Sequence, residues 1–138
     1  MRIMALDVGT KRIGVAMSDE LFLTAQGADT IYRTATAADM AKIKKVAEDN
    51  YVGEIVVGLP ISMNGTHSLK TKEVLEFADE LAKLVTVPVK TWDERLTTVQ
   101  AEKALLEADV SRGKRRLTID KIAAQIILQN YLDSRKRG

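Results

Sequence analysis

Apolar and polar positions near the start of the chain follow a pattern typical of strands. Apolar runs at 2–7 and 12–18 are joined by a short turn that contains Gly9, which predicts an antiparallel hairpin. The segment 25–33 has a weaker pattern of the same kind and is expected to form a third strand. The chain is therefore expected to open with three strands.

Two further strands are expected later in the chain. The apolar run 54–57 is ended by the glycine and proline of 58–60, which predicts a short buried strand parallel to the first. The segment 87–92 carries Pro88 near its start. Because proline cannot donate a ladder hydrogen bond, this last strand is expected at an edge of the sheet.

Apolar residues that recur every three or four positions predict helices between and after these later strands. The expected helices span 37–50, 68–85, 98–108 and 118–134. Thr97 and Gln100 resemble a capping box at the start of the third helix. The order of elements predicts an α/β fold with one mixed sheet.

Composition limits the chemistry that this fold can carry. The chain has 138 residues and we expect a single domain over 1–138. It has no cysteine and a single histidine, His67, which excludes a disulfide framework and a zinc site built from such ligands. Any metal must rest on oxygen ligands, which favours Mg²⁺ or Mn²⁺. No apolar stretch approaches the ~18–20 residues that span a bilayer and no signal-peptide pattern opens the chain, so we expect a cytoplasmic protein without a membrane partner.

The strongest candidate for a functional residue is Asp7, at the end of the first predicted strand. It continues the strand face of Ile3 and Ala5, which is expected to be buried. A carboxylate there is costly to bury unless something compensates its charge, and a bound metal ion is one such partner. The alternative is a strand-ending aspartate that bonds the amides of the following turn.

Two other acidic positions fall at the ends of predicted elements. Asp93 and Glu94 follow the last strand, and because strand neighbours point to opposite faces, only one of them should face the same cleft as Asp7. The longer Glu94 is favoured and Asp93 is the alternative. Asp120 lies in the first turn of the last predicted helix, where the helix dipole alone favours an acid, but the small alanines at 123–124 would allow a close approach to the sheet. Asp7, Glu94 and Asp120 together would form a divalent-metal site.

Positive charge is concentrated in a predicted loop at 112–116 and near the C-terminus, although the net charge is only +2. Such groups suit phosphate contacts, and the alternative for each is a solvated surface charge. The candidate substrate-binding residues are Lys11, Arg12, Asn64, Arg112, Lys114, Arg115 and Arg116. Trp92 is expected to be a packing residue, with base stacking as the alternative.

Four ordered segments resemble one known family. They are 6–14, 57–60 with 64–66, 93–98, and 120–132. They resemble the YqgF (RuvX) family of bacterial RNase H-like nucleases, essentially from end to end. The resemblance implies a five-stranded sheet in the order 3-2-1-4-5 with flanking helices. It also implies catalysis by Asp7, Glu94 (or Asp93) and Asp120, which would hold Mg²⁺ or Mn²⁺.

The resemblance implies a metal-dependent endonuclease that processes the 5′ end of pre-16S rRNA in ribosome biogenesis. One alternative is a Holliday junction resolvase, which would act on four-way DNA junctions as a homodimer. Residues 7–10 also resemble the phosphate loop of actin-like ATPases. A noncatalytic RNA-binding module is the last alternative. The expected partner is nucleic acid, either an rRNA precursor or branched DNA, and the protein is expected to be a monomer or a homodimer.

Overall fold

The computed structural model describes residues 1–62, 64–96 and 112–137, with the side chains of Leu96, 112–121 and 136–137 outside that description. The strands are β1 (Arg2–Val8), β2 (Arg12–Ser18), β3 (Ala25–Gly27), β4 (Ile31–Tyr32), β5 (Val52–Leu59) and β6 (Val89–Asp93). The helices are α1 (Thr36–Asp49), α2 (Leu69–Leu84), the short 3₁₀ helix η1 (Glu94–Leu96) and α4 (Arg112–Arg137).

The described strands form one mixed sheet in the order β3-β2-β1-β5-β6. β1 pairs antiparallel with β2 and parallel with β5, and β5 pairs parallel with β6. This path is the expected order 3-2-1-4-5, in which β5 and β6 are the expected fourth and fifth strands. β6 lies at the edge of the sheet, as the position of Pro88 predicts. The α/β class is confirmed.

The expected third strand over 25–33 is two strands, so the prediction of five strands was wrong. Both β3 and β4 pair with β2, where Ala16 faces Gly27 but Ile13 faces Ile31. One more residue therefore separates the pairs on the outer chain than on β2. An extra residue interrupts the ladder, as in a β-bulge, and a pattern of apolar residues alone does not show it.

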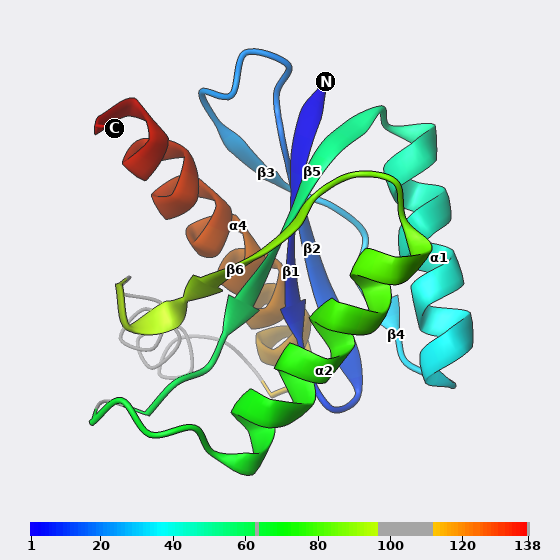
Figure 1. The fold of residues 1–138 in the computed structure, drawn as a ribbon, viewed down its shortest axis with the longest axis vertical. Helices are drawn as coiled ribbons and strands as arrows, with labels where there is room; N and C mark the ends of the chain where they lie inside the picture. Colours follow the sequence, from blue (N-terminus) through cyan, green and yellow to red (C-terminus); the bar gives the residue numbers. More distant parts are fainter. Residues whose placement is uncertain (63, 97–111, 138) are drawn as a thin grey trace.

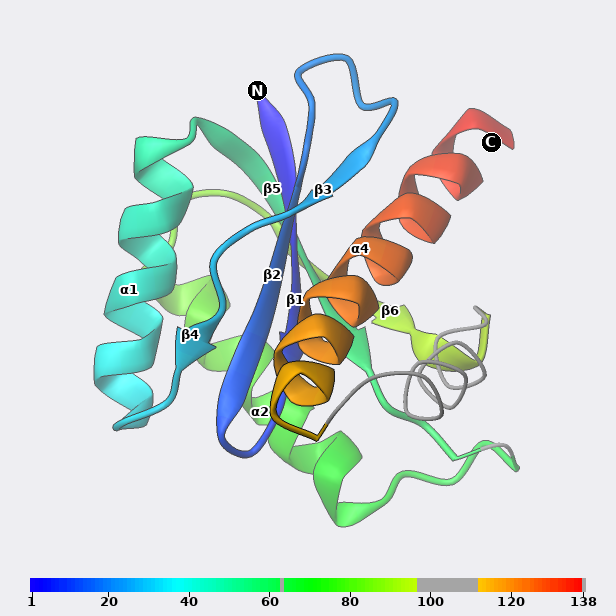
Figure 2. The ribbon, with the colours of Figure 1, turned by 180° about the vertical axis from the view of Figure 1, so that it is seen from behind.

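The sheet is covered on both faces, by α1 and α2 on one side and by α4 on the other (Figures 1 and 2). The alternation of strand side chains produces two separate cores. Met4 and Leu6 of β1 belong to the core under α1 and α2, whereas Ile3 and Ala5 pack under α4. Each position near the end of β1 is thereby assigned to one of two faces.

α1 and α2 begin and end within one residue of the expected bounds, but the last helix does not. α4 begins at Arg112, six residues before the expected start at Thr118, and so the prediction of a basic loop at 112–116 was wrong. Lysine and arginine are good helix formers, and a glycine costs only about 1 kcal/mol relative to alanine even in a helix interior, so Gly113 does not prevent the helix. The expected helix at 98–108 and its capping residues lie outside the described residues.

Across the described ranges, no helix combines the length and the apolar character required to cross a membrane.

Candidate active site

Asp7 lies on the face of the sheet that α4 covers. It follows Ile3 and Ala5 in the strand alternation, and those two residues are buried under α4. Asp7 is half-buried and pairs in register with Gly14 of β2, a neighbour without a side chain. The carboxylate therefore stands at the carboxyl end of a central strand, where open α/β sheets bind their ligands.

Glu94 lies on the same face, beyond the carboxyl ends of β5 and β6. Its residue is only 7% exposed. An added Cβ on Gly58 of β5 would lie 3.6 Å from Glu94 Cδ and 2.5 Å from Cδ1 of Ile127 on α4. The carboxyl group of Glu94 is thus held between the end of β5 and α4, in the layer that also holds Asp7.

Asp93, the alternative to Glu94, is engaged by its own neighbour. The Arg95 guanidinium donates to Asp93 through Nε at 3.1 Å and Nη2 at 2.7 Å, and the Arg95 amide donates at 2.9 Å. These hydrogen bonds from Arg95 lower the pKa of the Asp93 carboxyl against the opposing effect of burial, and the charge of nearby His67 lowers it further. Which of Asp93 and Glu94 is the partner of Asp7 stays a prediction.

Asp120 is part of α4, but the position of its side chain is outside the description. The first turns of α4 lie over the end of the sheet where β1 finishes (Figures 1 and 2). Ala123 and Ala124 follow Asp120 and are fully buried against the sheet, so the helix approaches it closely, as expected. Among the described side chains, no group of three acidic or histidine residues forms a metal site, and the complete triad stays a prediction.

The turn between β1 and β2 brings a cationic side chain to the same face. Arg12 pairs with Tyr32 across β2 and β4, and its guanidinium lies 6.0 Å from the centre of that ring. By strand alternation Arg12 shares the face of Gly14 and hence of Asp7. Its Nε is buried and has no hydrogen-bond partner within the described part of the chain. Because an unsatisfied buried donor is costly, this atom suits an anionic ligand.

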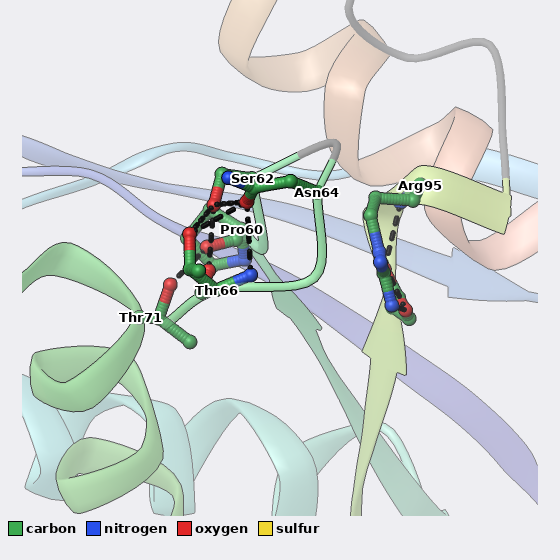
Figure 3. A network of polar contacts seen from close by, with 7 residues as sticks. Pro60, Ser62, Asn64, Thr66, Thr71 and Arg95 are labelled. Atoms are coloured by element: carbon green, nitrogen blue, oxygen red, sulfur yellow. Dashed lines mark hydrogen bonds and ion pairs between the residues drawn. The ribbon is translucent and has the colours of Figure 1, made fainter. Parts of the chain in front are cut away.

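The predicted contact residue Asn64 shapes its own loop. Its Oδ1 accepts hydrogen bonds from the Thr66 amide at 3.1 Å, the Thr66 hydroxyl at 2.7 Å and the Ser62 hydroxyl at 3.1 Å (Figure 3). Gly65, with φ of +85°, would place a Cβ 3.3 Å from Nη1 of Arg95. The loop is therefore built against the Asp93–Arg95 pair, and substrate contact by Asn64 stays a prediction.

A buried ion pair between Arg33 and Asp39 was not expected from the sequence. Asp39, in the first turn of α1, is 0% exposed and is bound by Arg33 at 3.1 Å. An acid in a first helical turn is common, and so its position carried no functional signal. The side chains of Arg112, Lys114, Arg115 and Arg116 lie outside the described residues, and substrate contact by these four and by Lys11 stays a prediction.

Solved structures share this arrangement of sheet and helices. The structure of Thermus thermophilus RuvC in complex with Holliday junction substrate matches 99% of this chain and 96% of its own, with a TM-score of 0.59 and 14% identity. The fowlpox virus Holliday junction resolvase matches 97% of this chain and 99% of its own, with a TM-score of 0.56 and 14% identity. The fold is therefore that of the RuvC-like, RNase H-like class.

The chain belongs to the RuvX family, whose model, described as "Holliday junction resolvase", matches residues 1–134. A Desulforamulus reducens protein described as "Putative pre-16S rRNA nuclease" is 52% identical over 134 residues, which is 97% of this chain and 98% of that protein. A Myxococcus xanthus protein of the same description is 52% identical over 136 residues, 99% of this chain and 90% of that protein. The resemblance seen in the motifs is confirmed, and the family is one of nucleases, hydrolases of phosphodiester bonds.

Proposed function

We propose that this protein is a metal-dependent endonuclease of the cytoplasm that processes the 5′ end of pre-16S rRNA. The observation that carries the proposal is the position of Asp7 and Glu94 on one face of the sheet, at the carboxyl ends of β1 and β6, the two strands that flank β5. Relatives that share about half of its residues are described as nucleases of that precursor.

The donor set suits a hard divalent cation. Asp7 and Glu94 offer carboxylate oxygens, and the chain has no cysteine and only one histidine, so oxygen ligands must predominate. Position 120 lies one helical turn before the buried Ala123 and Ala124 and therefore on the helix face that packs on the sheet. This supports Asp120 as the third ligand. These residues would hold Mg²⁺ or Mn²⁺, and such ions lower the pKa of bound water and stabilise the leaving oxygen of a phosphodiester.

The cationic residues around this site would bind the backbone of the substrate. Arg12, with its unsatisfied Nε on the face of Asp7, would bind a phosphate adjacent to the scissile bond. Lys11 in the same turn and the basic first turns of α4 (Arg112, Lys114, Arg115 and Arg116) would extend this contact along the strand. Phosphate contacts of this kind supply affinity and little base selectivity.

The test is cleavage of end-labelled precursor rRNA fragments with Mg²⁺, with Mn²⁺ and with EDTA. We expect Asp7→Asn and Glu94→Gln to lower the cleavage rate by at least about 100-fold while nucleic-acid binding and the folded state persist. Asp49→Asn removes an exposed carboxylate on α1 and is the matched control. Cleavage by Asp7→Asn at the wild-type rate would contradict the catalytic role and favour a noncatalytic RNA-binding module.

A second candidate is the resolution of four-way DNA junctions. The description of the family and the RuvC complex favour it. Resolution requires two active sites on symmetric strands and therefore a homodimer. The same variants assayed on a four-way junction, together with the molecular mass of the protein in solution, separate the two substrates: paired symmetric cuts by a dimer favour the junction.

A further inference from the structure

We infer that Arg33 is a positioning residue for the nuclease site, holding the β1–β2 turn so that Lys11 and Arg12 meet phosphate beside Asp7. The inference rests on the proposed function of this site. In this role Arg33 acts through the turn.

Arg33 binds the turn from both its side chain and its main chain. Its Nη1 donates to the carbonyl oxygen of Gly9 at 3.1 Å, and its amide donates to the carbonyl oxygen of Lys11 at 2.9 Å. Within the turn, the Gly9 amide donates to the Arg12 carbonyl at 2.8 Å. Gly9 follows Asp7 by two residues, so Arg33 constrains the segment immediately after the candidate metal ligand.

The guanidinium is itself held rigidly from two helices. Its Nε donates to Oδ2 of Asp39 at 3.1 Å, and the Asp39 side chain is only 1% exposed. The other oxygen of Asp39 accepts the Thr34 amide at 3.0 Å, which fixes the carboxylate. On α2, the ring of Phe77 lies 5.4 Å from the guanidinium carbon. Arg33 thus connects the β1–β2 turn to both α1 and α2.

A purely structural ion pair would not require this geometry. A lysine at position 33 could satisfy the buried Asp39, but its single ammonium group lacks the fork that lets Arg33 reach Asp39 and the Gly9 carbonyl at once. The two roles can therefore be separated by one conservative substitution. Arg33→Lys should preserve the ion pair and the main-chain bond to Lys11 and lose the side-chain bond to the Gly9 carbonyl.

The experiment compares Arg33→Lys and Arg33→Ala. Lys45→Ala is the control, because it removes a cation from an exposed ion pair with Asp49 on α1. The probes are a labelled precursor rRNA fragment and a labelled four-way DNA junction. We expect Arg33→Lys to keep a near-wild-type melting temperature and to raise KM about tenfold, as expected for the loss of one charge-assisted hydrogen bond. Arg33→Ala should lose both stability and affinity.

A double-mutant cycle with Arg12→Ala shows whether Arg33 acts through the turn. We expect Arg33→Lys to add little to the KM of an Arg12→Ala protein. Independent, multiplicative effects, or a wild-type KM for Arg33→Lys, would overturn the inference.

Failure of the wild-type protein to cut either probe would count against the proposed function and not against this inference. Amide hydrogen exchange tests the inference even in that case. We expect the Gly9 amide to exchange faster in Arg33→Lys while the amides of β5 are unchanged, and Lys45→Ala to leave both unchanged. Unaltered exchange at Gly9 would overturn the positioning role.

Discussion

Gly58 lies directly against the carboxyl group of Glu94, with only 3.6 Å between the Cδ of Glu94 and the place that a Cβ on Gly58 would take. The same Cβ would lie 2.5 Å from Cδ1 of Ile127. The missing side chain at the end of β5 is thus what allows η1 and α4 to approach each other over the strand. A glycine that reads in the sequence as a strand terminator serves here as a packing position.

Gly58→Ala should therefore lower the free energy of unfolding by about 1–3 kcal/mol, the usual cost of overpacking a core. Urea denaturation measures it. The atom that the new methyl group meets is the far end of the Ile127 side chain, so Ile127→Val removes it. We expect the double variant to be more stable than Gly58→Ala alone. Equal or lower stability of the double variant would show that the contact with Glu94 or the backbone dominates.

The basic first turns of α4 should supply salt-dependent affinity. Replacing Lys114, Arg115 and Arg116 with glutamine is expected to weaken nucleic-acid binding and to reduce the slope of log K against log salt by about 0.7–0.9 per charge removed. Titrations at several salt concentrations measure the slope. Lys42, Lys45 and Lys72 are exposed on α1 and α2, over the opposite face of the sheet, and their replacement by glutamine changes the net charge equally. An equal loss of slope in that control would contradict a role specific to α4.

The hydroxyl of Tyr131 should stabilise the packing of α4 on the sheet. It donates to Oε2 of Glu54 at 2.7 Å, and Glu54 is also paired with Lys90 at 3.1 Å and Arg135 at 3.3 Å. Tyr131→Phe removes one hydrogen bond to a charged group that keeps other partners, so we expect a loss of about 1 kcal/mol in the free energy of unfolding. Tyr51→Phe, at a residue 80% exposed, should have no effect.

The stability of the protein should fall in acid partly because of Asp39. Burial alone raises the pKa of this carboxyl, but the Thr34 amide and Arg33 outweigh it and hold the pKa below its usual value. A lowered folded-state pKa contributes stability that is present above the unfolded pKa of about 3.9 and is lost as pH falls through the folded-state pKa. Wild type should exceed Asp39→Asn in stability at pH 7, and the difference should shrink below about pH 4. Urea denaturation from pH 3 to pH 7 measures it, and a constant difference would contradict the assignment.

Local patterns in the sequence were sufficient for most elements of the fold. α1 and α2 bury apolar residues at helical spacing, and the β1–β2 hairpin depends on a turn in which a Cβ at Gly9 would meet the Arg12 carbonyl at 2.7 Å. The start of α4 was missed because Gly113 and its basic neighbours resemble a loop. The split between β3 and β4 was missed because register depends on the partner strand, β2.

By itself, the sequence determined the chemistry that is available and the face on which Asp7 lies, because strand alternation is local and the residue types are given. Only the tertiary structure decided that Glu94 lies against Gly58 and beside Ile127, since those two residues come from two other elements. The hydrogen bond from Arg33 to the carbonyl oxygen of Gly9, 24 residues away, was likewise decided only by the tertiary structure. Such contacts depend on how helices pack on the sheet, and that packing is a property of the whole chain.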